Sequence, residues 1–296
     1  MADLIEIRSG AYAGQLRSPK NEGRATTGNI HSDDDARRLG FRGGLVAGSI
    51  HMEQFAPLLV RAFSERFLER GSLSLYFLSP TLHGEPVRAF VGVPPEGAAD
   101  AQVEAWAERE SGERICEGTA AVGDPQQPSA LRARQLNRFE AVELRILGQA
   151  HAGDSFPEVE VSITPDLVEQ RLRVITEPMP WYSEATPWGG IVPPAVVQVN
   201  ALARPAYAYL DGRRAAAIGL YGAIELRNVN GPMLVGESYR GGGTLLAAGE
   251  SPKTEYVWFD SWADDRSGKR IAEMRMLLRF MKASSPAYAE AKAGDL

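Results

Sequence analysis

The chain has 296 residues, of which 44% are hydrophobic and 24% are charged, and its net charge is −6. This composition is typical of a globular protein, and the acid excess argues against a nucleic-acid binder, which usually carries a basic face. The single cysteine, Cys116, excludes a disulfide framework and a cysteine-built metal site. No segment approaches the roughly 20 apolar residues of a membrane span. The start MADLIEIRSG lacks the pattern of a signal peptide. We therefore expect a cytoplasmic protein with no membrane partner.

Residues 29–41 of the first half, NIHSDDDARRLGF, contain three consecutive acids. The residues that follow, ARRLGF, predict a short helix, because acids are favoured at a helix N-terminus. A glycine-rich bend leads into residues 49–71, where apolar side chains recur at three- or four-residue spacing and predict a long helix. Pro57 should kink or shorten this helix, and Gly71 is a plausible stop. Strand patterns follow at residues 72–78, 85–93, 102–110 and 114–122.

The second half repeats this order after a polar linker, DPQQPSALRARQ. A helix is predicted over residues 195–212, with Pro205 inside it as a second candidate kink. Strand patterns then occupy residues 223–229, 237–249, 254–264 and 270–281. Each half therefore combines one apolar helix with an antiparallel sheet, which is an α+β unit.

Three short sequences occur twice in the same order, which indicates a duplicated domain. GGLVAG at Gly43 corresponds to GGIVPP at Gly189, PTLHGEPVR corresponds to PMLVGESYR, and SGERI corresponds to SGKRI. The separations are 146, 152 and 156 residues, a slow growth that small loop insertions would produce. We expect a first domain over residues 1–135 and a second over 136–296.

The motifs resemble the MaoC-like (R)-specific enoyl-CoA hydratase/dehydratase family in its fused, two-domain form. NIHSDDDARRLGFRGGLVAG resembles the family signature, roughly G-D-x-N-P-[LIV]-H-x-D followed by G-F-x-x-x-[IL]-[VA]-H-G. FLSPTLHGEPVRAFVGV resembles the next strand pair, and TPWGGIVPP resembles the degenerate second half of fused members. The resemblance implies a double hotdog, with two antiparallel sheets each wrapped around a long central helix.

The resemblance also implies hydration of an enoyl thioester by an Asp/His pair, with a backbone N–H at the helix start holding the thioester oxygen. The motif histidine and asparagine correspond to His31 and Asn29, and Gly48 corresponds to the glycine at the helix start. The chain departs from the family at two positions. Thr26 stands where the catalytic aspartate is expected, and Ala47 stands where a second histidine is expected.

His31 is therefore the main candidate acid/base, since histidine titrates near neutral pH. Its alternative is a structural loop histidine. Asp33 is the leading acidic partner, although Asp33, Asp34 and Asp35 equally fit the N-terminal turn of a short helix. His51, one turn beyond Ala47, could replace the lost histidine or pack against the other half.

The second half carries aromatic residues and one carboxylate in the loop that aligns with the His31 loop. Trp181, Tyr182 and Glu184 could line an apolar substrate tunnel, with Glu184 as a possible acid/base if burial raises its pKa. They could also simply pack beneath the helix.

The combined prediction is a hydratase or dehydratase that adds or removes water at a double bond conjugated to a thioester or other carbonyl. We expect a small-molecule substrate such as an acyl-CoA, no cofactor, no metal, and possible homodimers. Two alternatives stay open. A hotdog thioesterase would use Glu53, the acid in the first two turns of the helix, and a non-catalytic binding or partner subunit would explain Thr26 and Ala47.

Overall fold

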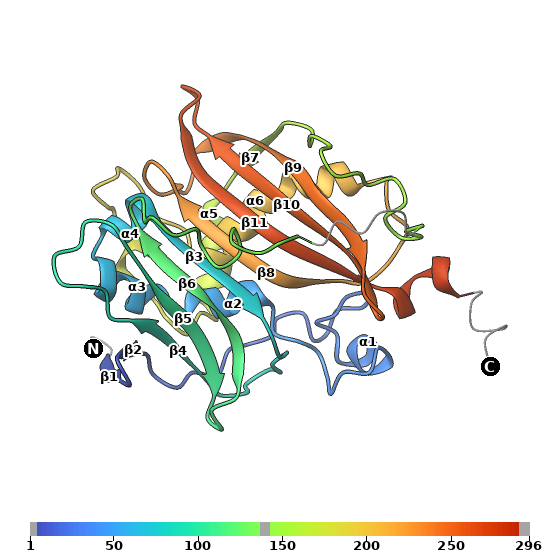
Figure 1. Ribbon diagram of the computed structural model, residues 1–296, viewed down its shortest axis with the longest axis horizontal. Helices are drawn as coiled ribbons and strands as arrows, with labels where there is room; N and C mark the ends of the chain where they lie inside the picture. Colours follow the sequence, from blue (N-terminus) through green and yellow to red (C-terminus); the bar gives the residue numbers. More distant parts are fainter. Residues whose placement is uncertain (1–4, 137–142, 290–296) are drawn as a thin grey trace.

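The computed structural model describes residues 5–136 and 143–289, and within them the strands form one 11-stranded antiparallel sheet (Figure 1). The first half contributes β1 (Glu6–Arg8), β2 (Ala11–Ala13), β3 (Gly71–Phe77), β4 (Val87–Gly92), β5 (Ala101–Arg109) and β6 (Arg114–Val122). The second contributes β7 (Val159–Ser162), β8 (Gly219–Asn228), β9 (Ser238–Glu250), β10 (Thr254–Asp264) and β11 (Arg270–Met281). All eight strands predicted from alternation are present.

The two halves meet through β3 and β8, which pair antiparallel with Leu75 opposite Ile224. The sheets predicted for each half are thus joined edge to edge, in the order β1-β2-β4-β5-β6-β3-β8-β11-β10-β9-β7. Both side chains of this central pair are fully buried, so the junction belongs to the hydrophobic core. The repeated SG sequences form the β5–β6 and β10–β11 turns, where Gly112 and Gly268 adopt the positive φ that a tight turn requires.

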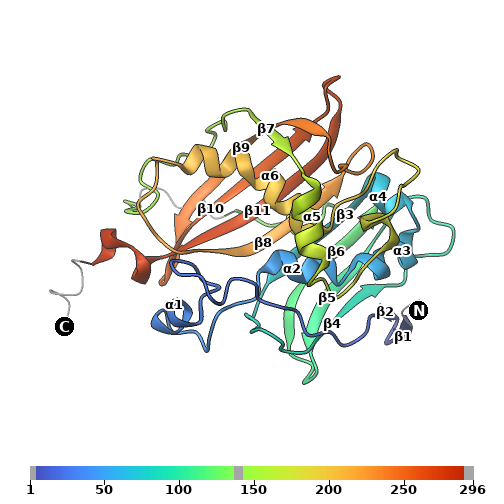
Figure 2. The ribbon, with the colours of Figure 1, turned by 180° about the vertical axis from the view of Figure 1, so that it is seen from behind.

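The helices cover one face of the sheet, as the view from behind shows (Figure 2). In the second half α6 (Ala195–Leu210) is a single helix that runs through Pro205 without interruption. A further helix, α5 (Pro165–Leu172), was not predicted, because its sequence carries only a weak apolar stripe.

The first half differs from the prediction of one long helix. Residues 49–71 instead give α2 (Gly48–Glu53), α3 (Ala56–Phe63) and α4 (Arg66–Arg70). Pro57 occupies the first turn of α3, where its missing N–H costs nothing. Ser64, at φ 58°, ends α3 in a backbone conformation that few side chains adopt. The apolar spacing continues across both breaks: α2 and α3 bury apolar side chains, and Phe67 of α4 packs, partly buried, against the same core.

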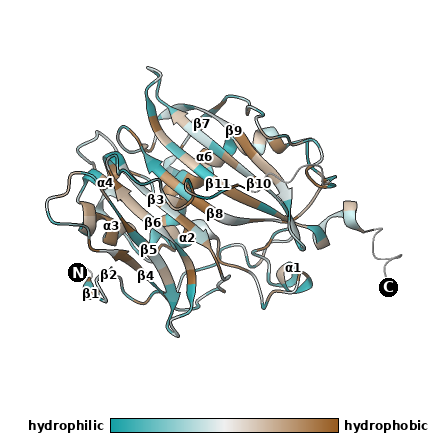
Figure 3. Ribbon diagram, viewed as in Figure 1, coloured by the Kyte–Doolittle hydropathy of each residue, from teal (hydrophilic) through white to brown (hydrophobic). Residues whose placement is uncertain are grey.

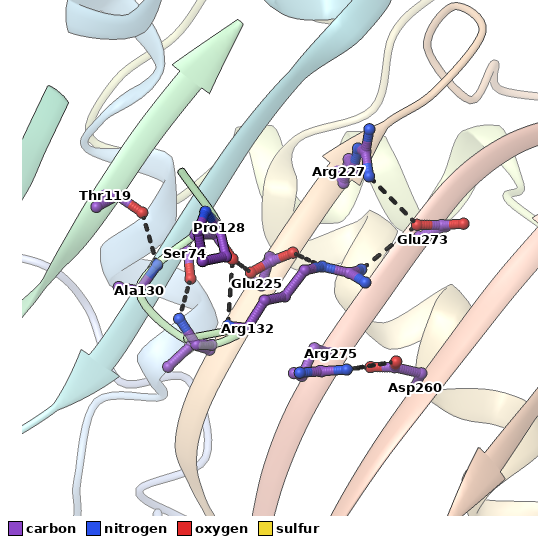
Figure 4. Close-up of polar contacts among 12 residues, drawn as sticks. Ser74, Thr119, Pro128, Ala130, Arg132, Glu225, Arg227, Asp260, Glu273 and Arg275 are labelled. Carbon is purple, nitrogen blue, oxygen red and sulfur yellow. Dashed lines mark hydrogen bonds and ion pairs between the residues drawn. The ribbon is translucent and has the colours of Figure 1, made fainter. Parts of the chain in front are cut away.

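The polar linker between the halves lies on the outer face of the sheet (Figure 4). Arg132 donates from Nε to the buried Glu225 carboxylate of β8 at 2.6 Å, and the Ser129 hydroxyl donates to the same carboxylate. The Leu131 backbone N–H donates to the Ser74 hydroxyl of β3, and the Leu131 side chain is fully buried. The linker therefore bridges strands that belong to different halves.

Hydrophobic residues concentrate in the strands and in the helices that face them, whereas the short helix α1 (Asp33–Arg38) is largely hydrophilic (Figure 3). No helix among the described residues is long and apolar enough to cross a membrane. Residues 1–4, at the chain start considered for targeting, lie outside the described residues. The domain boundary at 135/136 adjoins residues 137–142, which are also outside them, and stays a prediction.

Candidate active site

A cavity of about 400 Å³ lies where the two halves meet, and both halves build its walls. One wall comes from the loop between Gly28 and Gly48, with the end of β3 beside it. The opposite wall comes from the end of α6 and from β8 and β11 of the second half. The volume falls in the range of small-molecule sites, which is roughly 300–1,000 Å³.

His31 lines this cavity, and a single hydrogen bond fixes its ring. The ring Nδ1 lies 2.8 Å from the Leu45 backbone carbonyl oxygen. Because a carbonyl oxygen can only accept, Nδ1 must carry the hydrogen when the imidazole is neutral, and Nε2 then holds a free lone pair. Within residues 5–136 and 143–289, Nε2 has no hydrogen-bond partner. His31 is thus held as an oriented base at the wall of the cavity.

The backbone of His31 is held as firmly as its ring. Asn29 accepts from the His31 N–H at 2.8 Å, and the buried Asn21 donates from Nδ2 to the His31 carbonyl at 2.8 Å. Two glycines make room for this segment. A Cβ at Gly44 would lie 2.0 Å from the His31 carbonyl oxygen, and one at Gly23 would lie 2.5 Å from the His31 Cβ. Asn29 shapes the loop and does not line the cavity, and its role in substrate binding stays a prediction.

Asp33 is the first residue of α1, after the N-cap Ser32. Its carboxylate accepts from Arg24 at 2.7 Å and from the Gly44 backbone N–H at 2.8 Å. The Arg24 hydrogen bond, followed by that of Gly44, lowers the pKa of Asp33. Asp33 is not among the residues that line the cavity. Its contacts are those of an anchor between the acidic stretch and the glycine bend, and its catalytic role stays a prediction.

Gly48 lines the cavity at the start of α2, next to the N-cap Ala47. A Cβ at this position would lie 2.4 Å from the Phe77 ring, so only glycine allows this approach. As the first residue of α2, Gly48 has no intrahelical acceptor for its N–H. Thr26, at the other departure from the family pattern, is exposed on the loop and does not line the cavity.

His51 also lines the cavity, although its side chain is buried, with a relative exposure of 3%. Its Nε2 lies 2.6 Å from the Thr81 hydroxyl, and its Nδ1 has no hydrogen-bond partner among the described residues. Burial, with a smaller contribution from the Arg109 charge, lowers the pKa of His51 to about 4. His51 is therefore a neutral ring near neutral pH, able to bind but poorly suited to carry a proton.

The opposite wall contains polar residues that the sequence did not single out. The Tyr207 and Tyr221 hydroxyls lie 3.3 Å apart, and Arg214 and Arg279 line the same cavity. Burial raises the pKa of both tyrosines, so they remain neutral hydrogen-bond donors. The two tyrosines and two arginines form no motif in the sequence, because they come close together only when α6, β8 and β11 pack against one another.

Trp181 and Tyr182 do not line the His31 cavity. They line a separate cavity of about 60 Å³ toward the other end of the β3–β8 pair, against α2 and α3. Burial raises the pKa of Tyr182 far above its usual range, so its hydroxyl stays neutral. Glu184 is exposed and lines neither cavity. The structure therefore separates the second-half loop from His31.

No protein-family model matches the sequence, and no curated protein matches it. Solved structures are similar instead. A protein described as a MaoC domain dehydratase from Chloroflexus aurantiacus J-10-fl is 10% identical with a TM-score of 0.61, covering 93% of this chain and 96% of that one. A MaoC-like dehydratase is 14% identical with a TM-score of 0.55, covering 94% and 100%.

A conserved hypothetical protein from Mycobacterium tuberculosis, with a double hotdog fold, is 12% identical with a TM-score of 0.55 and covers 95% and 97%. At these identities the likeness concerns the fold and not the chemistry. The structural neighbours include MaoC-like dehydratases, and the chain itself has the double hotdog fold.

Proposed function

We propose that the protein is a MaoC-like hydratase or dehydratase that adds or removes water at a double bond conjugated to a thioester carbonyl. The observation that carries this proposal is the His31 ring, whose Nδ1 is fixed on the Leu45 carbonyl while Nε2 is left as a base at the cavity wall. Such a base, oriented by a backbone acceptor, is what general acid–base catalysis requires.

His31 alone can supply both proton transfers. Nε2 takes a proton from water as the water oxygen bonds to the β-carbon, and the electrons of the double bond move to the thioester oxygen. The resulting imidazolium then returns a proton to the α-carbon, which restores the carbonyl. The N–H of Gly48, at the start of α2, would stabilise the negative oxygen between the two steps.

The cavity lining supports a mechanism with one histidine. It contains no aspartate or glutamate among the described residues, so no carboxylate there takes the place of the lost Asp at Thr26. Asp33 remains the leading acidic partner only if it leaves Arg24 when substrate binds.

The thioesterase alternative finds less support. Glu53, its candidate base, is buried in α2 and does not line the His31 cavity. Both of its carboxylate oxygens accept hydrogen bonds from Arg171 of α5, at 2.7 to 3.0 Å. A carboxylate held in this way is not available to activate water.

A non-catalytic binding subunit is the second candidate, and the carboxylate-free lining of the cavity favours it. Turnover distinguishes it from the lyase, since a binding subunit would retain ligand without converting it.

His31→Ala provides the test, with His151→Ala as its control because His151 is exposed and remote from the cavity. Crotonyl-CoA and longer enoyl-CoAs are followed by the absorbance of the conjugated thioester. We expect turnover to fall by about 100-fold or more in His31→Ala, while butyryl-CoA still binds and His151→Ala behaves as wild type. Unchanged turnover in His31→Ala would refute the role of His31. A wild-type protein that binds butyryl-CoA and hydrates no enoyl-CoA would favour the binding subunit.

A further inference from the structure

The charged side chains that line the His31 cavity all carry the same sign. Arg214 and Arg279 line it, and no aspartate or glutamate among the described residues does. The chain as a whole has a net charge of −6, so this local excess of positive charge runs against the average. Arginine in a partly enclosed cavity without an acid attracts an anionic ligand.

Arg214 is the less engaged of the two arginines. Its Nη1 donates to the Ala215 carbonyl at 3.3 Å, and its guanidinium lies 5.1 Å from the centre of the Phe280 ring. Among the described residues no ion pair is recorded for Arg214. Most of its N–H donors therefore remain free for a ligand. Arg279, by contrast, donates to the Tyr76 hydroxyl at 2.8 Å.

The tyrosine pair adds a neutral donor beside this charge. When one of the hydroxyls of Tyr207 and Tyr221 donates to the other, one O–H remains free to donate to a ligand. Arg214 lines the same cavity as both tyrosines. A planar guanidinium beside a phenol O–H suits a carboxylate, which accepts bidentate hydrogen bonds.

We propose that Arg214, with Tyr207 and Tyr221, binds a carboxylate carried by the acyl part of the substrate. The substrate would then be a thioester of a short dicarboxylic acid, with its free carboxylate on the second-half wall and its double bond at His31. A cavity of about 400 Å³ suits a short acyl group of this kind. This inference rests on the proposed function, because it takes the thioester at His31 as given.

The test is calorimetric binding of two saturated thioesters, glutaryl-CoA and pentanoyl-CoA, which share a carrier and chain length and undergo no hydration. Arg214→Gln removes the charge. Arg213→Gln is its matched control, since Arg213 also contacts a backbone carbonyl and an aromatic ring, both of Tyr209, but does not line the cavity.

We expect wild type and Arg213→Gln to bind glutaryl-CoA about tenfold more tightly than pentanoyl-CoA. Arg214→Gln should lose this preference while its affinity for pentanoyl-CoA stays within about twofold, and Arg214→Lys should keep part of the preference.

Equal wild-type affinities for the two thioesters would overturn the carboxylate subsite alone, and this outcome needs no variant to fold. An equal loss of both affinities in Arg214→Gln would also overturn it, because the arginine would then serve the phosphates of the carrier or the fold. Binding of neither thioester would overturn both this inference and the CoA thioester chemistry of the proposed function.

Discussion

At the scale of single residues, the cavity depends on how tightly the His31 loop is packed. The glycine pair that repeats in both halves has a local purpose in the first, because Gly44 lies where any Cβ would meet the His31 carbonyl. The resemblance to a family signature identified His31 and Gly48 as residues of one site, and the structure brings both to the cavity. The resemblance could not reveal Asn21, because its hydrogen bond to the His31 carbonyl joins residues ten positions apart and lies outside the signature.

His51 should make stability depend on pH. Its pKa is about 4 in the folded protein, against 6.5 for an unperturbed histidine, so the unfolded chain binds more protons between these values. The contribution of His51 to stability is therefore lost as pH falls from about 6.5 to about 4, by about 3 kcal/mol in total. Glu53 acts in the opposite direction, because its pKa is raised from 4.5 to about 7 and keeping it buried costs stability as it ionises. Urea unfolding measured across this window checks the prediction.

His51→Gln should lose only the His51 contribution, so its stability relative to wild type should rise by about 3 kcal/mol as pH falls through this window. The variant keeps a polar partner for Thr81 and removes the titration. His151→Gln should follow wild type, since His151 is exposed. Parallel curves for wild type and His51→Gln would contradict the assignment of the pH dependence to His51.

At the scale of elements, alternation predicted the strands well and the helices less well. The strands alternate between a core face and an opposite face, so their pattern is fixed by burial. The helical pattern of residues 49–71 continues through Ser64 because α3 buries apolar residues and Phe67 of α4 packs, partly buried, against the same core. Apolar spacing alone cannot reveal that one residue, Ser64, has a positive φ. Helix α5 was missed because its apolar stripe is weak, and its contact with α2 is polar.

That contact is the ion pair between Glu53 of α2 and Arg171 of α5, whose side chains are 1% and 6% exposed. Burial raises the pKa of Glu53 to about 7, although Arg171 acts against the rise. Arg171→Gln should therefore lower the free energy of unfolding at about pH 8 by about 3 kcal/mol, because it removes the charge that opposes the cost of burying the ionised Glu53 carboxylate.

The control is Arg173→Gln, which breaks an exposed pair with Glu169 within α5 and should cost less than about 0.5 kcal/mol. Unfolding in urea measures both. Equal, small effects would show that the buried pair does not hold the two elements together, and loss of turnover at unchanged stability would restore the thioesterase hypothesis.

At the scale of the whole molecule, the linker fastens the two halves across their shared sheet. The composition of residues 124–135 predicted a linker, but it gave no sign that Arg132 would meet Glu225, whose side chain is 1% exposed. Arg132→Ala should lower the free energy of unfolding by about 2 kcal/mol, less than for a fully buried pair because Arg132 is partly exposed.

A double-mutant cycle isolates the Arg132–Glu225 interaction. In a Glu225→Gln background, the further loss on removing Arg132 should be well below the loss in wild type. Equal losses would mean that Arg132 contributes through Glu273 or packing instead. Arg173→Ala, at an exposed site, serves as the reference for arginine truncation.

The β3–β8 pair has one cavity toward each end, and their volumes differ, at about 400 and 60 Å³. In an assembly of identical subunits, every substitution would appear in both sites at once, so neither wall could change without altering its twin. Joining the copies in one polypeptide removes that constraint. The second half can then lack a histidine and still form the wall opposite His31. Substitutions in that wall can change substrate preference without changing the acid–base residue.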